Sequence, residues 1–264
     1  MDLQIKGKTA LVTGSTAGIG LAIATLLAQE GVKVVINGRT QARVDAAIGQ
    51  IKKAVPGANL VGAAGDVGQV DGVTTVVKSV PEVDILVNNA GIFEPKAFAE
   101  IPDADWMRFF EVNVMSGVRL SRAYLPSMMK KNWGRIIFIS SESAVNIPAE
   151  MIHYGLTKTS QLALSRGLAE TTAGTGVTVN AVLPGPTRSE GVEEFVKNLA
   201  TSRKTTEAMV ETDFFKTIRP SSLLKRFATT DEVAAMVVYS CSAVASATNG
   251  AALRVDGGVV RSIV

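Results

Sequence analysis

Tyr154 and Lys158 are four residues apart in the stretch His-Tyr-Gly-Leu-Thr-Lys, a spacing that places both side chains on one face of a helix. A phenol with a pKa near 10 is a poor proton donor or acceptor at neutral pH. A lysine ammonium one helical turn away favours the phenolate and lowers the pKa of the phenol. The pair therefore predicts acid–base chemistry at a carbonyl or hydroxyl group. The same spacing also arises by chance, so other parts of the sequence have to support this interpretation.

A second chemical feature is the loop Thr-Gly-Ser-Thr-Ala-Gly-Ile-Gly at residues 13–20, between a strand-like run and a helical pattern. At such a junction, free N–H groups and the helix dipole favour a pyrophosphate. The glycine spacing differs from the G-x-G-x-x-G dinucleotide fingerprint, and a tight turn without a ligand is the structural alternative. The loop predicts dinucleotide binding through Gly14, Ser15, Thr16, Gly18, Ile19 and Gly20.

The end of the second strand-like run indicates which dinucleotide is bound. This run ends at Asn37-Gly38, and Arg39 follows with no carboxylate at the tip. In this geometry an acidic residue binds the ribose hydroxyls of NAD, whereas an arginine accommodates the extra phosphate of NADP. Gly38 leaves room, and Arg39 offers a planar guanidinium for that phosphate. The sequence predicts NADP, with NAD as the alternative cofactor and a solvated surface arginine as the structural alternative.

The elements that must position these residues alternate along the whole chain, with short β-branched runs between longer helical patterns. Such alternation predicts right-handed βαβ crossovers and a parallel sheet. We expect a single-domain, Rossmann-type, doubly wound α/β fold over residues 1–264, with about seven strands. A helical pattern from Asp103 toward Trp133 is expected to bend or break at Pro126. Residues 186–230 are irregular, with no clean strand. The strand-like runs are 9–13, 33–37, 59–65, 84–89, 135–140, 178–184 and 252–257.

The composition argues against several classes of function. A single cysteine, Cys241, excludes an internal disulfide framework and favours a cytoplasmic protein. The net charge of +3 is too diffuse to indicate a nucleic-acid partner. No uninterrupted apolar run is long enough for a membrane span. One histidine and one cysteine give no basis for a metal site.

The glycine loop, the Asn-Asn-Ala-Gly stretch at 88–91 and the Tyr154/Lys158 pair occur in the order found in one family. On these residues the chain resembles a short-chain dehydrogenase/reductase of the classical subfamily, over essentially its whole length. The individual motifs are weak, but their order and spacing make the match specific. Further matching positions are Asp66-Val67, Asn113, Ser141, Pro184-Gly185 and the Arg-Val-Asp-Gly-Gly stretch at 254–258.

The resemblance implies a catalytic tetrad of Asn113, Ser141, Tyr154 and Lys158. Tyr154 would protonate the substrate carbonyl in reduction and act as the base in oxidation. Lys158 would favour the phenolate and hold the nicotinamide ribose hydroxyls, while Ser141 would hydrogen-bond the carbonyl oxygen. Asn113 would bend its helix and keep a water in the proton path to Lys158. A surface polar residue and a hydrogen bond between helices are the alternatives for Asn113.

Four neighbours of these residues need separate interpretations. Ser140 and Ser143 compete with Ser141, and the distance in sequence from the tyrosine selects Ser141. His153 is predicted to have a structural or rim role, because adjacent helix positions face different ways. Glu142 would lie near the substrate carbonyl, and whether its charge repels anionic substrates is left open.

The resemblance also implies further contacts to the cofactor. Asp66 would accept from the adenine amino group, and the backbone of Val67 would frame the ring. Small residues after the fourth strand would let the backbone approach the cofactor. The turn after the sixth strand would pass the nicotinamide. These two segments contribute Asn89, Ala90 and Gly91, and Pro184, Gly185 and Thr187, and Tyr154 and Lys158 complete the cofactor contacts.

The predicted function is an NADP(H)-preferring oxidoreductase that reduces a carbonyl to a secondary alcohol, or the reverse, on a small molecule. A 3-oxoacyl-thioester-reductase-like activity is the leading version. The alternatives are an NAD-dependent sugar or hydroxysteroid-like alcohol dehydrogenase and a non-catalytic dinucleotide sensor, although sensors commonly lose the Tyr–Lys pair. The resemblance implies a substrate lid at about 187–226. It also implies a homotetramer that pairs the helices around 103–132 and 154–172. Four residues of the lid are expected either to line an apolar pocket or to pin the lid down: Phe195, Met209, Phe214 and Phe215.

Overall fold

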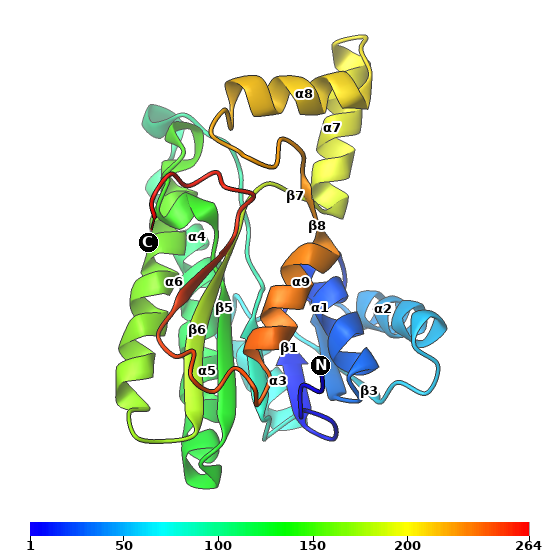
Figure 1. The fold of residues 1–264 in the computed structure, drawn as a ribbon, viewed down its shortest axis with the longest axis vertical. Helices are drawn as coiled ribbons and strands as arrows, with labels where there is room; N and C mark the ends of the chain where they lie inside the picture. Colours follow the sequence, from blue (N-terminus) through cyan, green and yellow to red (C-terminus); the bar gives the residue numbers. More distant parts are fainter. Residues whose placement is uncertain (264) are drawn as a thin grey trace.

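Seven strands form one parallel sheet in the computed structural model, which describes residues 1–263 (Figure 1). The strand order is β3-β2-β1-β4-β5-β6-β9, so the direction of winding reverses between β1 and β4. Helices cover both faces of the sheet, which explains why the central strands are apolar at successive positions rather than alternating. The strands are β1 (Thr9–Val12), β2 (Lys33–Gly38), β3 (Leu60–Ala64), β4 (Ile85–Asn88), β5 (Gly134–Ile139), β6 (Val177–Pro184) and β9 (Ala252–Val255).

Two hydrophobic cores lie on the two faces of this sheet. Helices α1, α2 and α9 pack on one face, and α3, α5 and α6 pack on the other (Figure 1). This confirms the predicted doubly wound α/β fold. None of the helices in residues 1–263 is long and apolar enough to cross a membrane. The helices named here are α1 (Gly18–Gln29), α2 (Gln41–Ala54), α3 (Val70–Ser79), α5 (Ser116–Lys131), α6 (Ile152–Thr171) and α9 (Thr230–Ser240).

The helical pattern after Asp103 departs from α-helical geometry earlier than expected. Helix α4 (Asp103–Phe110) leads into a π-helical turn (Glu111–Met115), and α5 continues from that turn with Pro126 inside it. A π turn fits one extra residue into a helical path and is frequently found at functional sites. The departure therefore lies around Asn113 and not at the proline.

The region expected to be irregular contains two helices, α7 (Glu190–Ser202) and α8 (Glu207–Thr217). Two short parallel strands, β7 (Thr187–Arg188) and β8 (Ala228–Thr229), join its ends. We call residues 187–229 the cap segment. Its helices project beyond the body of the domain (Figure 1). The cap segment has a small core of its own, formed by Val196, Ala200, Val210, Phe215 and Phe227.

The small core shows which of the two expected roles Phe214 and Phe215 have. Phe214 and Phe215 pack against each other and against Phe227, with ring centroids 5.1 to 5.2 Å apart. Phe195 and Met209 are exposed. Phe214 and Phe215 therefore hold the cap segment together.

Candidate functional site

The glycine loop is held by two asparagines from neighbouring strands. The N–H of Gly14 donates to Oδ1 of Asn37 at 3.2 Å, and Nδ2 of Asn89 donates to the carbonyls of Thr13 and Gly14 at 2.8 and 3.2 Å. A Cβ atom on Gly20 would lie only 2.5 Å from Nδ2 of Asn89 and from the carbonyl oxygen of Gly14. The loop therefore approaches the end of β4 so closely that only glycine fits at position 20.

The first turn of α1 is suited to an anion. Its N-cap is Ala17, which offers no side-chain acceptor, and the first turn holds no acidic residue. By contrast, threonine side chains cap α2, α8 and α9. The first N–H groups of a helix need acceptors outside the helix, and the helix dipole favours a negative charge there. A dinucleotide pyrophosphate fits this uncapped end, with the glycine loop as its cradle.

Two residues at the end of β2, Asn37 and Arg39, have different surroundings. Asn37 is buried and holds the glycine loop, whereas Arg39 is exposed directly after the strand. A Cβ atom on Gly38 would lie 2.5 Å from Cγ2 of Thr16 in the same loop. Packing against Thr16 therefore favours glycine at this position, and Arg39 follows it as an exposed residue.

The remaining predicted cofactor residues follow the carboxyl ends of β3, β4 and β6. Oδ1 of Asp66 accepts from the N–H of Gly68 at 3.0 Å, while the side chain of Val67 is buried in the core. The hydroxyl of Thr187 donates to the carbonyl of Gly185 at 2.9 Å. In a parallel sheet these ends meet at one edge, which is where open α/β folds bind ligands. That edge gathers Asp66, Val67, Asn89, Ala90, Gly91, Pro184, Gly185 and Thr187.

Three serines after β5 have different partners. Ser140 donates to the carbonyl of Lys158 at 2.9 Å, and Ser143 donates to Oε1 of Glu142 at 3.3 Å. The hydroxyl of Ser141 accepts from the N–H of Ser143 at 3.1 Å and also hydrogen-bonds with Tyr154, which favours the phenolate. Of the three serines, Ser141 is therefore the one that faces the tyrosine.

Burial decides the protonation of the Tyr154/Lys158 pair in the chain alone. Burial raises the pKa of Tyr154 to about 12, against the smaller opposing effect of Ser141. Burial also lowers the pKa of Lys158 from 10.5 to about 7. Nζ of Lys158 lies 5.6 Å from the centre of the Tyr154 ring and donates to the carbonyl of Ile139 at 2.8 Å. The expected lowering of the tyrosine pKa by the lysine is thus absent, because burial drives both groups toward their neutral forms.

Asn113 lies in the π turn and joins three segments. Its Oδ1 accepts from the N–H of Ile92 at 2.7 Å, and its Nδ2 donates to the carbonyl of Ile92 and to the hydroxyl of Thr157, both at 3.0 Å. Its backbone carbonyl accepts from Nε2 of Gln161 at 2.6 Å, and Oε1 of Gln161 accepts from Nζ of Lys158 at 3.2 Å. Gln161 was not among the site residues predicted from the sequence. The signal for it was a polar side chain three residues after Lys158, on the same helix face.

Glu142 forms a buried ion pair with Arg219 of the cap segment. Nε of Arg219 donates to Oε1 of Glu142 at 2.9 Å, with side-chain exposures of 10% and 4%. A second, longer contact of 3.4 Å joins Nη1 of Arg219 to Glu150. The charge of Glu142 raises the pKa of Tyr154, and the charge of Arg219 lowers it. Both charges therefore reach the predicted acid, and the carboxylate of Glu142 does not stand unpaired beside the site.

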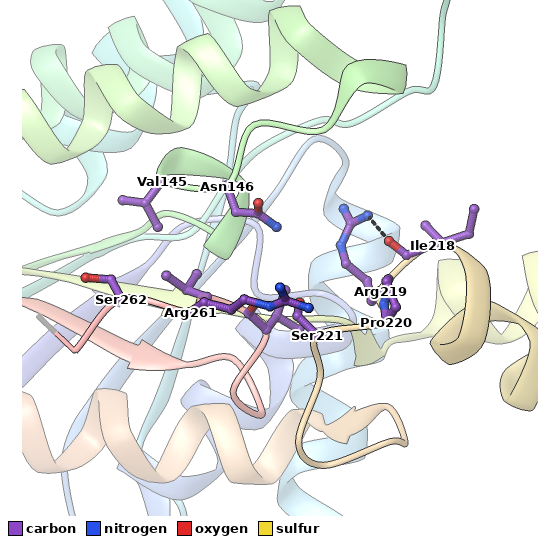
Figure 2. A pocket seen from close by; sticks show the side chains of 10 residues that line it. Val145, Asn146, Ile218, Arg219, Pro220, Ser221, Arg261 and Ser262 are labelled. Carbon is purple, nitrogen blue, oxygen red and sulfur yellow. Dashed lines mark hydrogen bonds between the residues drawn. The ribbon is translucent and has the colours of Figure 1, made fainter.

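A cavity of about 500 Å³ adjoins this ion pair (Figure 2). Figure 2 shows Val145 and Asn146 on one side of it, Ile218 and Arg219 on another, and the C-terminal segment around Arg261 on a third. Neither Ser141 nor Tyr154 lines the cavity. It therefore neighbours the predicted reaction site without containing it.

His153 is enclosed by aromatic rings. The ring centroids of Phe109 and Trp106 lie 4.0 and 5.8 Å from that of His153, and the side chain is buried. Its Nδ1 has no hydrogen-bond partner in the described chain, and burial lowers its pKa. These surroundings support a structural role. Among residues 1–263, no group of three or more His, Cys, Asp or Glu side chains could hold a metal ion.

Comparisons with known proteins match the whole chain. The family model described as short chain dehydrogenase matches residues 8–200. An uncharacterized oxidoreductase of Bacillus subtilis, YvaG, is 51% identical over 263 residues, covering 100% of both chains. FabG of Aquifex aeolicus, a 3-oxoacyl-[acyl-carrier-protein] reductase, is 32% identical over 98% of this chain and 100% of its own. The crystal structure of L-sorbose reductase from Gluconobacter frateurii, complexed with NADPH and L-sorbose, superposes with a TM-score of 0.94 at 33% identity, covering 100% of both chains.

Proposed function

The chain belongs to the short-chain dehydrogenase family, and on that basis we propose that it reduces a ketone to a secondary alcohol with NADP(H), or catalyses the reverse reaction. One observation carries the proposal. Ser141, directly after β5, interacts with the phenol of Tyr154, and Nζ of Lys158 lies 5.6 Å from the centre of the tyrosine ring. This arrangement provides a hydrogen-bond donor and a proton donor for a single carbonyl oxygen.

The residues divide the reaction between them. A bound nicotinamide cofactor supplies or accepts the hydride. Ser141 holds the carbonyl oxygen, and the phenol of Tyr154 donates a proton to it as the alkoxide forms. Burial keeps Tyr154 protonated, which is the form that reduction requires at the start. Lys158, at the same site, places a positive charge near the phenolate left after proton transfer, and this charge stabilises it.

The preference for NADP over NAD rests on the end of β2. Arg39 is exposed beside the glycine loop, and Gly38 places no carboxylate where NAD would need one. The structural neighbour L-sorbose reductase is complexed with NADPH, which agrees with this choice. The residues proposed to contact the cofactor are the ones predicted from the sequence, from the glycine loop through to Thr187.

Two substrate classes fit the proposed reaction, and the charged wall beside Ser141 favours the second. The first is a 3-oxoacyl thioester, in line with the similarity to FabG. The second is a polyhydroxylated ketone, in line with the neighbour complexed with L-sorbose. Glu142, Arg219 and Glu150 form a charged, hydrogen-bonding cluster, and Arg219 extends it to a cavity that is also lined by the apolar Val145 and Ile218. Phe214 and Phe215, which an acyl chain would need, pack inside the cap segment.

The test follows NADPH and NADH absorbance over ketoses, 3-oxoacyl thioesters and cyclic ketones. Tyr154→Phe is expected to lower turnover by about 10²- to 10⁴-fold, the usual contribution of a general acid. Tyr239→Phe, which removes an exposed hydroxyl on α9, serves as the matched control and should leave turnover unchanged. Turnover that survives in Tyr154→Phe would overturn the mechanism. NADPH binding without turnover of any ketone would favour the non-catalytic sensor.

We also propose that the protein is cytoplasmic and forms a homotetramer. The single cysteine, Cys241, is buried and unpaired, which fits a reducing compartment. Apolar side chains are exposed or half-buried on α4, the first part of the predicted helix around 103–132, and on α6, which corresponds to the predicted helix around 154–172. They are Met107, Leu156, Leu164 and Leu168. Light scattering should give the mass of four chains, and a stable monomer would contradict the assembly.

A further inference from the structure

Gln161 is a buried polar side chain to which the resemblance assigns no function. It lies on α6 with 1% of its surface exposed. Oε1 accepts from Nζ of Lys158 at 3.2 Å, and Nε2 donates to the backbone carbonyl of Asn113 at 2.6 Å. One amide therefore connects two members of the predicted tetrad.

The chemistry of its partners fixes the orientation of this amide. A lysine ammonium only donates hydrogen bonds, and a backbone carbonyl only accepts them. The oxygen of Gln161 must therefore face Lys158, and the nitrogen must face Asn113. Reversing the amide would leave both buried contacts unsatisfied, which is costly away from water.

The π turn supplies the carbonyl that Gln161 contacts. In this turn the N–H of Ser116 donates to the carbonyl of Glu111, five residues back, which differs from the four-residue spacing of an α-helix. The carbonyl of Asn113 in the same turn accepts the side-chain amide. The π turn and the glutamine on α6 are therefore joined by a direct hydrogen bond.

The hydrogen bond between Gln161 and Lys158 also determines where the lysine ammonium points. An ammonium group has three N–H donors, and Ile139 and Gln161 accept two of them. A Cβ atom on Gly91 would lie 3.5 Å from Nζ, so the absence of a side chain there leaves space on the cofactor side. The third N–H of the Lys158 ammonium is therefore available to a bound cofactor.

We propose that Gln161 is a positioning residue that aims the Lys158 ammonium and stabilises its charged form through the Asn113 carbonyl. The resemblance implies a water between Asn113 and Lys158, whereas here a tethered amide makes the connection. The role in catalysis rests on the proposed function, but the effect on Lys158 does not require turnover.

The first measurement is the pKa of Lys158 in the cofactor-free protein, followed by NMR of lysine labelled with ¹³C at Cε. Gln161→Met keeps the length of the side chain and removes the amide. It should lower the pKa of Lys158 by about one unit, because the ammonium loses an acceptor. Gln161→Glu keeps an acceptor and adds a negative charge, so it should raise that pKa. Ser165→Ala, one turn along α6 at a buried hydroxyl without a partner, is the control.

The second measurement is the pH profile of kcat in the oxidation direction. Gln161→Met should lower kcat by about 10- to 100-fold, the effect expected for one hydrogen bond to a charged group. It should also shift the rise of kcat with pH to higher pH, because a less charged Lys158 stabilises the Tyr154 phenolate less, while the Kd for NADPH changes less. An unchanged Lys158 pKa in folded Gln161→Met would overturn the proposal. If the parent reduces no ketone, the proposed function fails, and the lysine titration still decides the role of Gln161.

Discussion

Arg219 reaches from the cap segment to Glu142, the residue directly after Ser141, with 2.9 Å between Nε and Oε1. The two charges act on the pKa of Tyr154 in opposite directions, so their effects on this residue oppose each other in the ion pair. The position of the cap segment and the protonation of the proposed acid are thereby coupled through one ion pair.

Arg219→Met should destabilise the protein by roughly 3–5 kcal/mol, because it leaves the buried carboxylate of Glu142 without a cationic partner. The double variant Glu142→Gln/Arg219→Met should recover most of this loss. Arg203→Met is the matched control, since its ion pair with Asp213 in the same segment is exposed and contributes about 0–1 kcal/mol. Urea unfolding gives the free energies. Equal losses for the two single variants would contradict the buried character of the pair.

Lys158→Met should abolish activity and yet stabilise the cofactor-free protein. Burial lowers the pKa of Lys158 to about 7 in the folded chain, from an ordinary value of 10.5. Between these two values the unfolded chain binds more protons, so this group makes stability rise with pH. The stabilising effect of Lys158→Met should therefore be largest below pH 7 and shrink toward pH 10.5. Unfolding free energies over that range, with the exposed Lys52→Met as control, test the slope. A gap that is independent of pH would count against the buried charge.

Arg39→Ala should weaken NADPH binding by about 10- to 100-fold and leave NADH nearly unchanged, because only NADPH carries the extra phosphate. Arg43→Ala removes an exposed arginine one turn into α2 and should affect neither cofactor. Fluorescence titration with both cofactors gives the dissociation constants. A parallel loss for NADH would show that Arg39 acts on the fold of the loop.

Reversing the cofactor preference requires two changes at once. Gly38→Asp alone should weaken binding of both cofactors, since its Cβ would lie 2.5 Å from Cγ2 of Thr16. Thr16→Ser removes that methyl group, so the double variant Gly38→Asp/Thr16→Ser should bind NADH more tightly than the parent. The same titrations check this, and tight NADH binding by the single variant would refute the steric argument.

His153→Leu should keep the activity and flatten the acid dependence of stability. Burial lowers the pKa of His153 below its ordinary 6.5, so stability is lost as pH falls from 6.5 toward the lowered value. His153 is the only histidine of the chain, which makes a slope near pH 6 assignable to it. Unfolding free energies at pH 7 and pH 5 should differ more in the parent than in the variant. A loss of kcat at neutral pH would instead place His153 in the reaction.

The sequence was sufficient for the sheet and for the residues at its carboxyl edge. Apolar runs, glycines and the order of motifs are local signals, and the edge follows from the parallel topology. The helices of the cap segment were missed. In α7 the apolar residues Val192, Val196 and Leu199 recur at helical spacing, so a local signal was present, whereas the apolar residues of α8 show little periodicity. At the π turn, the resemblance implied a bend at Asn113, but no local pattern predicted the extra residue. Pro126 is a visible helix breaker, whereas the extra residue near Asn113 has no composition of its own.

The protonation of the site was also beyond the sequence. The Tyr154/Lys158 spacing predicts a shared helix face, but the pKa values depend on how deeply both groups are buried. The partners of Glu142 and Gln161 lie 77 and 48 residues away along the chain. Such contacts are set by the packing of distant elements, which no local pattern encodes.

The separate core of the cap segment has a consequence for how such a protein diversifies. Val196, Val210 and Phe215 pack among themselves. The sequence of the segment between β7 and β8 can therefore change with little disturbance of the sheet. The contacts to the rest of the domain, among them the Arg219–Glu142 ion pair and the hydrogen bond from Ser221 to the carbonyl of Val259, must be kept or replaced as a matched set. New substrate ranges are then accessible by exchanging about one-sixth of the chain, while the hydride-transfer machinery is inherited intact.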